Sequence, residues 1–498
     1  MAFCWALAAL GAEREVTVQR AVQLAAELSP DDLWEKTRDA STLAWNESHT
    51  LHALVDLYEV TGDRKYLDDV VFRGDRMLSH RDDRRGVPDA SGVARPGWTM
   101  GFKYVVASGE LVDAEKKPIL KVRSTPFAFN HLTKLQVISG ANGRFRLLVS
   151  NEHFKSEEAF DDLSLDTADV RFVEKIVNHP RSPMTPVTQP GEAVSQLIRV
   201  TVVKNVASGA MLSDQTITLQ PIPLAYMGYI GIIYHPLLRL CEIVRADAKL
   251  ADLGPAAQRF IDAAEESYAD AAKRLWRDGP NAGEGYYLYC EKGESYPHDN
   301  IGQPFNYLGR HTAAELALFR LNGNAEHRER AEKMAGLLKH RLEHDAANDL
   351  YRWNYWYEPA TKGWTSDDDL SFNTPWFAPY TSPEDTSHGV LDIEGVAAAH
   401  AEKLVFDDAD LKRFANTFLK NVMLPDRSGV HRKVDGKGDP YHAYDAASRG
   451  WLVLSRANPE VLQADFELYR RQEKDDFRWL AALLKWQKVL SPLPPGEN

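Results

Sequence analysis

The chain has 498 residues, 44% hydrophobic and 26% charged, so it can bury a sizeable interior and is expected to be a soluble globular protein. A formal net charge of −13, with no run of Lys and Arg interleaved with aromatic residues, argues against a nucleic-acid groove. The same acidity fits an anionic substrate only if Arg and His are concentrated in one cleft.

The apolar opening MAFCWALAALGAERE, residues 1–15, resembles the end of a secretory signal but lacks its basic start. We therefore expect a truncated signal segment or simply a first helix, and a secreted or periplasmic protein. Three cysteines provide no disulfide framework. After the opening, no stretch reaches the roughly 18 apolar residues that a membrane span needs.

Helical hairpins of one design recur along the chain. Residues 41–83 read as helix, turn TGD and helix, and residues 309–341 repeat this design with NGN as the turn. Looser copies are residues 394–423, 450–471 and 235–268. Each pairs a small-residue apolar helix with a charged amphipathic one, as inner and outer helices require. Irregular spacing and long Trp-rich insertions favour a closed α/α toroid over an open solenoid, which predicts a mainly α fold.

Residues 101–221 change to alternating runs of β-branched residues broken by Gly, Asn and Pro, with one short helix over TADVRFVEKIVN. Because helical hairpins flank these runs, we predict an inserted β-rich α+β module that divides the toroid into residues 16–100 and 222–490. The module's simplest roles are to cover one rim or to mediate self-association into a homo-oligomer. Carbohydrate binding is a further alternative.

Inner helices of a toroid point one set of ends at a central cavity, and four candidate starts stand out: AWNESHTLH, YPHDNIGQPFNYLGRH, TSPEDTSHG and DPYHAYDAASRGW. In the first, Trp45, His49 and His52 share one helix face, with Asn46 beside them. One interpretation of this pattern is a cavity wall with an aromatic platform and hydrogen-bond donors. The alternative is a buried face with satisfied histidines, which is favoured for His52.

In the second start, Pro304 fits the first helical position. Asn306 and Arg310 then share one face, and Tyr307 and His311 another. Arg310 and Asn306 together suit a carboxylate, because Arg offers two parallel donors and Asn an amide donor. The alternative is that Arg310 pairs with a nearby acidic side chain.

Residues 351–380 are unusually aromatic. Their Trp and Tyr residues are Trp353, Trp356, Trp364, Trp376, Tyr351, Tyr355, Tyr357 and Tyr380. Aromatic faces with polar edges match sugar rings, so this composition favours a glycan-binding cleft over an interlocked aromatic core.

In the third start, Ser382 is a good N-cap, Pro383 fits the first helical position, and Ser382 with Asp385 approximates a capping box. His388 lies about one turn inside this helix, which predicts a single candidate base at the mouth of the cavity. Glu384 stays ambiguous between a first-turn partner of the helix dipole and the acid of a hydrolase.

Glu384, His388 and Asp392 are also spaced to present metal ligands along one stripe. The short-spaced His pair typical of zinc sites is missing, so we expect no metal. No cofactor is expected either.

Helical hairpins, Trp- and Tyr-rich loops, and Asn, His, Tyr and Arg at the inner helix starts resemble the α/α-toroid polysaccharide lyases of the alginate and glucuronan type. The resemblance covers the helical parts, and the β-rich insert departs from the simplest members. Such lyases cleave uronic-acid-containing glycans by β-elimination. Asn, His or Arg neutralises the uronate carboxylate, His or Tyr removes the C5 proton, and a Tyr commonly returns a proton to the leaving oxygen.

The resemblance implies His388 as the base and Tyr357 or Tyr307 as the acid. Electrostatic donors of this kind typically contribute ~3 kcal/mol each, and a positioned base ~100-fold. The residues implied for the carboxylate are Arg310 and Asn306, assisted by His49 or His298. The other substrate-binding candidates are Trp45, Asn46, Tyr307, Trp353, Trp356, Trp376, Tyr444 and Arg449.

Three other functions remain open for a polysaccharide or oligosaccharide ligand. A glycoside hydrolase would use Glu384 or Asp385 with Asp299, about 6.5–9.5 Å apart if inverting. A sugar epimerase would use His298 and His388 as paired acid and base. A non-catalytic glycan-binding protein would use the aromatic loop as a static platform.

Overall fold

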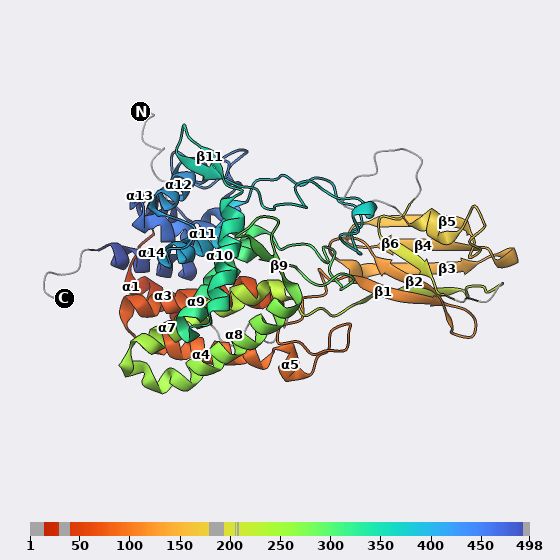
Figure 1. Ribbon diagram of the computed structural model, residues 1–498, viewed down its shortest axis with the longest axis horizontal. Helices are drawn as coiled ribbons and strands as arrows, with labels where there is room; N and C mark the ends of the chain where they lie inside the picture. The colour runs from red at the N-terminus through yellow and green to blue at the C-terminus, as the bar shows by residue number, and fades with distance from the viewer. Residues whose placement is uncertain (1–13, 29–39, 179–193, 205, 207–208, 492–498) are drawn as a thin grey trace, which may run out of the picture.

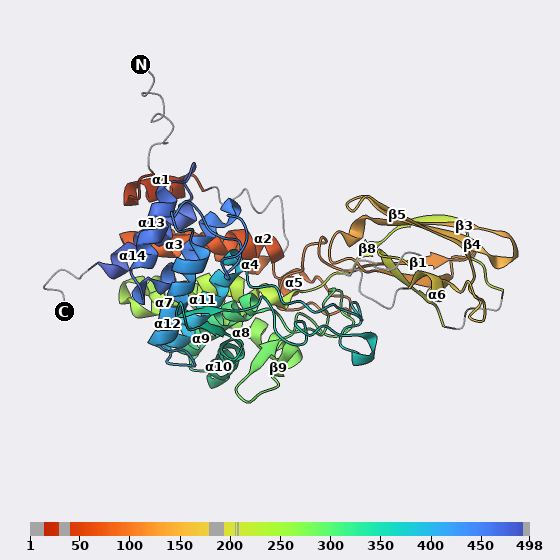
Figure 2. The same cartoon turned by 90° about the horizontal axis from the view of Figure 1, so that it is seen from above.

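The computed structural model describes residues 14–28, 40–178, 194–204, 206 and 209–491. The protein is mainly α-helical, with small antiparallel sheets. Figures 1 and 2 show the helices gathered in one body and the strands of the insert projecting from one side of it. The expected signal segment lies outside the described residues, apart from Arg14 and Glu15.

Six inner helices follow one another in contact, and the last packs against the first. They are α3 (Ser48–Thr61), α7 (Ile230–Ala246), α9 (Phe305–Asn322), α11 (Thr386–Ala401), the 3-10 helix η8 (His442–Arg456) and α14 (Phe477–Leu490).

Each of six outer helices packs against two successive inner helices. In the same order they are α4 (Lys65–Ser79), α8 (Gly254–Leu275), α10 (Ala325–Lys339), α12 (Asp408–Thr417), α13 (Glu460–Arg470) and α1 (Val18–Ala26). The first five inner and outer helices are the five predicted hairpins. The sixth pair, α14 with α1, joins the two ends of the described chain.

Glycines explain the hairpin turns and the close packing of the inner helices. Gly62 and Gly323 end α3 and α9 in the left-handed conformation, with φ of 70° and 77°, which glycine adopts without strain. Where α9 crosses α11, a Cβ on Gly309 would lie 2.4 Å from the Leu391 carbonyl oxygen, and one on Gly395 2.5 Å from the Gly309 oxygen. Small residues are therefore required at this crossing.

The insert contains two four-stranded antiparallel sheets with a hydrophobic core of their own. One has the order β6-β2-β1-β8 and the other β5-β4-β3-β7. The strands are β1 (Ala107–Val112), β2 (Pro118–Ser124), β3 (Thr133–Ser139), β4 (Phe145–Asn151), β5 (Ser156–Leu163), β6 (Ile198–Val202), β7 (Gln215–Thr218) and β8 (Gln220–Pro221), and the helix is α6 (Val173–Val177).

Shorter elements connect the helices. They are α2 (Ala40–Thr42), the π-helical turn η1 (Leu43–Glu47), α5 (Asp82–Arg85), β9 (Trp276–Asp278), β10 (Gly285–Tyr287), β11 (Glu343–Asp345), β12 (Leu350–Arg352), the 3-10 turn η6 (Ser366–Asp368) and the π-helical turn η7 (Phe418–Val422). Among the described residues, Met227–Ala246 is a helix long and apolar enough to cross a membrane, but 78% of its hydropathy window is buried in the protein.

Two predicted helix starts are wrong by a few residues. The N-cap of α11 is Asp385 and not Ser382, because the Asp385 side chain accepts from the backbone N–H groups of Ser387 and His388. Asp385 also forms an isolated antiparallel β-bridge with Lys433, which fixes its extended backbone. Pro304 is the N-cap of α9 and not its first helical residue.

Candidate functional site

A cavity of about 490 Å³ lies among the inner helices, a volume typical of small-molecule sites. It is lined from α3, α7, α11, η8 and α14, with Trp45 from η1. Its polar and aromatic lining comprises Trp45, His49, His52, Asp56, His235, Arg239, Ser387, His388, Glu394, Arg449, Arg478, Lys485 and Trp486. The sequence predicted Trp45, His49, His388 and Arg449 as site residues, and the fold brings these four to one cavity.

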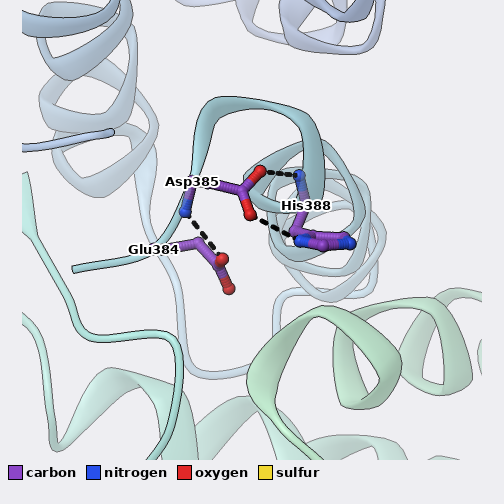
Figure 3. A group of neighbouring side chains, drawn as sticks. All are labelled: Glu384, Asp385 and His388. Carbon is purple, nitrogen blue, oxygen red and sulfur yellow. Dashed lines mark hydrogen bonds and ion pairs between the residues drawn. The ribbon is translucent and has the colours of Figure 1, made fainter. Parts of the chain in front are cut away.

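His388 is held by the cap of its own helix (Figure 3). The Asp385 Oδ2 atom accepts from His388 Nδ1 at 2.6 Å, and Oδ1 accepts from the backbone N–H of His388 at 3.0 Å. This contact places the proton on Nδ1 and leaves Nε2 as the free nitrogen of the ring. About a third of the His388 side chain is exposed, so Nε2 can contact a ligand in the cavity.

The two partners of this pair shift in opposite directions. The pKa of Asp385 falls to about 2, because its hydrogen bonds to His388 and Ser387 and the nearby imidazolium outweigh its burial. Burial lowers the pKa of His388, but the hydrogen bond and charge of Asp385 outweigh it and raise the value above its ordinary range. Asp385 is therefore ionised whenever His388 titrates, as in an Asp–His acid–base pair.

Glu384 lies beside this pair but faces the protein interior. Its carboxyl is fully buried, Oε1 accepts from the backbone N–H of Asp385 at 2.8 Å, and the carboxyl shares a hydrogen bond with that of Asp392. Burial and the neighbouring Asp392 carboxyl raise the pKa of Glu384 well above its ordinary value. Asp392, which accepts from Trp353 Nε1, has a pKa raised to about 8 by burial. The two carboxyls therefore form a buried, largely protonated pair outside the cavity lining.

Glu384, Asp385 and His388 place potential ligand atoms within 4.8 Å of one another, close enough to hold a metal ion. Both Asp385 oxygens, however, already accept hydrogen bonds from Ser387 and His388. Helix capping and orientation of the imidazole thus account for Asp385 without an ion.

Later turns of the inner helices fill the other end of the cavity, called here the inner end, with paired charges. Arg310 is 1% exposed and forms an ion pair with Glu394. Arg239 and Lys485 both contact the Asp56 carboxylate, at 2.7 and 3.0 Å. The alternative of an acidic partner for Arg310 is therefore the observed one.

Two histidines lie against these arginines. Nε2 and Nδ1 of His52 face Arg310 and Arg239 at 3.0 and 3.1 Å, and His235 Nδ1 lies 2.6 Å from Arg310. Burial and the adjacent arginines lower the pKa of both imidazoles well below the ordinary value. Because guanidinium groups face both ring nitrogens of His52, that residue has no free nitrogen for a substrate.

The end of the cavity nearer the first turns, called here the helix-start end, has two cations that carboxylates reach only at longer range. The charges of Glu394 and Asp465 act on Arg449, and those of Asp476 and Glu47 act on Arg478. No ion pair to Arg449 or Arg478 occurs among the described residues, and the only hydrogen bond found for either runs from Arg449 to the Ala446 carbonyl. Burial and the charge of Arg449 lower the pKa of Arg478. His49 is neutral for the same reasons, since burial and then Arg449 lower its pKa well below the ordinary value.

Helix dipoles add to this positive potential. His388 and Arg478 stand in the first turns of α11 and α14, whereas His49 lies inside a continuous helical run that begins at Ala40; all three line the cavity. Partial positive charge at helix N-termini favours an anion there. In a protein with a net charge of −13, this cluster is the local concentration of Arg and His that an anionic substrate requires.

Trp45 forms an aromatic wall at this end. Its ring centroid lies 5.6 Å from that of His388 and 6.2 Å from that of His49. Tyr307 packs behind it at 6.4 Å and is 9% exposed, so it supports the wall without lining the cavity. A half-buried indole between two imidazoles suits the C–H face of a sugar ring.

Several predicted site residues lie elsewhere. Asn46 is exposed and points away from the lining. Asn306 is fully buried, with Oδ1 accepting from the backbone N–H of Tyr307 and Nδ2 unpaired. Tyr357 is buried against Phe305 and Tyr286, and its hydroxyl has no partner. Neither Asn306 nor Tyr357 reaches the cavity.

The aromatic segment is mostly an interlocked core and not the open cleft that its composition favours. Trp353, Trp356 and Trp364 are 3–6% exposed, and each indole N–H donates within the protein. Trp376 is half-buried, and Tyr444 is half-buried beside Ser387.

The second helix start also proves structural. His298 is buried among aromatic rings, including those of Trp356 and Phe377, and burial lowers its pKa to about 4. Asp299 is fully buried, and its oxygens accept from Gly293, Ser371, Phe372 and Asn373. The hydrolase candidate Asp299 is therefore the anchor of a loop, and His298 does not face His388 across the cavity.

Sequence reasoning missed Arg478, Glu394, His235 and Arg239 of the lining. His235 and Arg239 are polar residues four apart in an apolar helix, a pattern that marks a polar stripe on an inner face. Arg478 lies in DDFRWLAALLKW, where Asp476 caps an apolar, small-residue helix of the inner type.

No family model matches this chain, and a search of the curated proteins finds no match. Among solved structures, the crystal structure of a D-mannose isomerase is similar to 56% of this chain and 75% of its own, with 12% identity and a TM-score of 0.33. This likeness is too weak to assign a fold or an activity.

Proposed function

We propose that this protein is a sugar-processing enzyme that removes the proton next to the carboxylate of a uronic acid residue. The observation that carries the proposal is the Asp385–His388 pair in one cavity with Arg449 and Arg478, two arginines that form no ion pair with any described residue. A base beside cationic side chains that can bind a carboxylate is what this proton transfer requires.

The chemistry divides between these residues. Arg449 and Arg478 bind the uronate carboxylate, and their charge stabilises the enolate-like anion that forms when the C5 proton leaves. His388 Nε2 accepts that proton, while Asp385 holds the ring and stabilises the imidazolium. Trp45 supports the sugar face. The enzyme needs neutral His388, so its rate rises with pH through a pKa above the ordinary histidine value.

Elimination is the first candidate outcome, which makes the enzyme a polysaccharide lyase. The C4–O bond breaks as the anion collapses, and the leaving oxygen takes a proton. The lining contains no tyrosine, so the His388 imidazolium is the acid available to return the proton it has taken. Tyr357 and Tyr307, the acids implied by resemblance, lie outside the lining.

Epimerisation is the second candidate, and the histidines favour it. His49 and His388 line the same cavity, and their pKa values shift in opposite directions. Pairs of titratable groups with separated pKa values are typical acid–base partners. An epimerase would take the proton with one histidine and return another from the opposite face.

The helical body is proposed to be a closed α/α toroid around this cavity. The circular order of contacts from α3 through α14 and back to α3, with an outer helix across each junction, supports this architecture. The chain is proposed to act outside the cytoplasm on a polysaccharide or oligosaccharide.

A screen of uronate-containing polysaccharides followed by near-ultraviolet absorbance tests the proposal, because elimination creates an unsaturated uronide. Solvent deuterium at C5 without that absorbance would identify epimerisation. New reducing ends with C5 protium retained would overturn both and indicate a hydrolase. Binding without turnover of any member would leave a static glycan-binding protein.

A further inference from the structure

A second hollow lies on the insert, outside the cavity described above. It has a volume of about 560 Å³ and is lined by the outer face of the β6-β2-β1 part of one sheet and by the loop residues Phe372 and Asn373. The opposite face of the same strands, including Val122, Ile198 and Val200, is buried in the core of the insert. The hollow is therefore built from two distant parts of the chain.

Two arginines stand side by side on this face. Arg123 of β2 and Arg199 of β6 are directly opposite in the antiparallel register. Like charges in such a cross-strand pair repel each other. Neither arginine has an ion pair with any described residue, and burial lowers the pKa of both guanidinium groups. Glu110 and Lys121 lie opposite each other on β1 and β2, and the charge of the buried Asp299 carboxylate offsets part of the lowering of both arginine pKa values.

Phe372 completes the hollow. Its ring is 49% exposed, and the Arg123 and Arg199 guanidinium carbons lie 5.5 and 5.8 Å from its centroid. Asn373 Oδ1 accepts from Arg123 Nε at 2.7 Å, and the Phe372 carbonyl accepts from Arg199 at 2.8 Å. Asp299 fixes the loop from behind. The exposed Phe372 ring, flanked by two guanidinium groups, is therefore a surface that a ligand can contact.

We infer that this hollow binds a carboxylate-bearing segment of a sugar chain, as an accessory site that holds an acidic polysaccharide while the cavity acts on it. Arg199, which donates to the Phe372 carbonyl through one Nη, supplies the fork that a carboxylate matches, and Arg123 adds positive charge beside it while its Nε and one Nη donate within the protein. Phe372 supplies a platform for a sugar's C–H face, and Ser108 and Thr201 on the same face supply hydroxyls. The substrate class rests on the function proposed above.

The test measures retention of the full-length protein on alginate, polyglucuronate and polygalacturonate gels, with dextran as the neutral control. Arg199→Ala and Phe372→Ala should each weaken the binding of at least one polyuronate on the order of tenfold. Lys134→Ala, which removes an exposed charge from β3 of the other sheet, should bind as the wild type does. Arg123 is not substituted in this test, because it also donates hydrogen bonds to the Gly293 and Glu294 carbonyl oxygens and its loss would disturb that loop.

The same variants should keep wild-type turnover of the shortest oligomer, because the hollow lies outside the cavity. Equal binding by wild type, Arg199→Ala and Phe372→Ala would overturn the inference even if uronates are turned over. Arg199-dependent binding without turnover would support the binding site in the hollow and contradict the proposed enzymatic activity. Arg199-dependent binding of polyglutamate as strong as that of the polyuronates would point to an acidic peptide and overturn the sugar assignment.

Discussion

The two ends of the cavity use arginine and histidine in opposite ways. At the inner end, Arg310 pairs with Glu394 and packs against His52, so the charge is neutralised within the protein. At the helix-start end, Arg449 and Arg478 lack such partners, and the His388 imidazole keeps one nitrogen free. The difference shows that residue type alone does not identify a binding arginine. A binding arginine is identified by the lack of a close ion-pair partner together with an oriented base beside it.

Substitutions at the inner end should lower the free energy of unfolding more than substitutions at the helix-start end do. Arg310→Met takes the ion-pair partner from the Glu394 carboxylate, whose side chain is 23% exposed on the cavity wall, so we expect a loss of roughly 1.5–3 kcal/mol in the free energy of unfolding. Arg478→Met removes an unpaired charge and should cost less than about 1 kcal/mol. Urea unfolding of the two variants measures the contrast.

The double variant Arg310→Met with Glu394→Leu is the control for that contrast. It removes both charges and should recover much of the stability that the single variant loses. Equal stability of Arg310→Met and Arg478→Met would contradict the assignment of the inner end to structure.

Substitutions at the helix-start end should instead reduce the rate of turnover. His388→Gln removes the base, and turnover of the uronate polymer should fall by ~100-fold or more. His344→Gln changes an exposed histidine on β11 and should leave the rate unchanged. Near-normal turnover by a folded His388→Gln protein would show that the base lies elsewhere.

Asp385→Asn separates orientation from helix capping. Asn still caps the helix through its side-chain oxygen, but it no longer accepts from His388 Nδ1 with a charged oxygen. We expect a fall in kcat of ~100-fold and an acid limb of the pH–rate profile moved to lower pH, since the raised pKa of His388 depends on Asp385. An unmoved limb would mean that another group titrates.

Arg449→Lys and Arg478→Lys should weaken kcat/KM by about tenfold each, because lysine keeps the charge but loses the parallel donors. Arg471→Lys at the C-cap of α13, exposed and outside the cavity, is the matched control. Rates unaffected by both cavity substitutions would move the carboxylate site away from these arginines.

The smallest effect concerns the buried pair Glu384 and Asp392. Asp392 holds its proton up to about pH 8 in the folded protein but only to about its ordinary value of 3.8 when unfolded, so stability falls as pH rises between these values. Asp392→Asn removes this titration and should be more stable at pH 8 by about 1–3 kcal/mol. Thermal unfolding between pH 5 and 8 measures it, and a slope equal to that of the wild type would contradict the protonated pair.

Local patterns predicted the helical hairpins, because helical periodicity and glycine caps such as Gly62 and Gly323 act within a few residues. The pairing of α14 with α1 was not predicted, because these helices lie at opposite ends of the sequence and meet only in the folded chain. Within the insert, β2 and β5 have weak sequence signals, because lysine and acidic residues interrupt their apolar alternation.

The candidate site was predictable where it depends on a first helical turn, as for His388. It was not predictable where the partner is distant in sequence. Glu394 neutralises Arg310 from another helix, and this pairing decides that Arg310 is structural. Likewise, Asp385 and not Ser382 caps α11, because a bridge to Lys433 sets the backbone there.

The central claim, that His388 removes the C5 proton of a uronate held by Arg449 and Arg478, is tested most directly by nuclear magnetic resonance in D₂O. Wild-type protein with a uronate polymer from the screen should produce either a vinylic C4 proton or deuterium at C5, and His388→Gln should produce neither. Cleavage of the polymer with C5 protium retained and no unsaturated product would contradict the account.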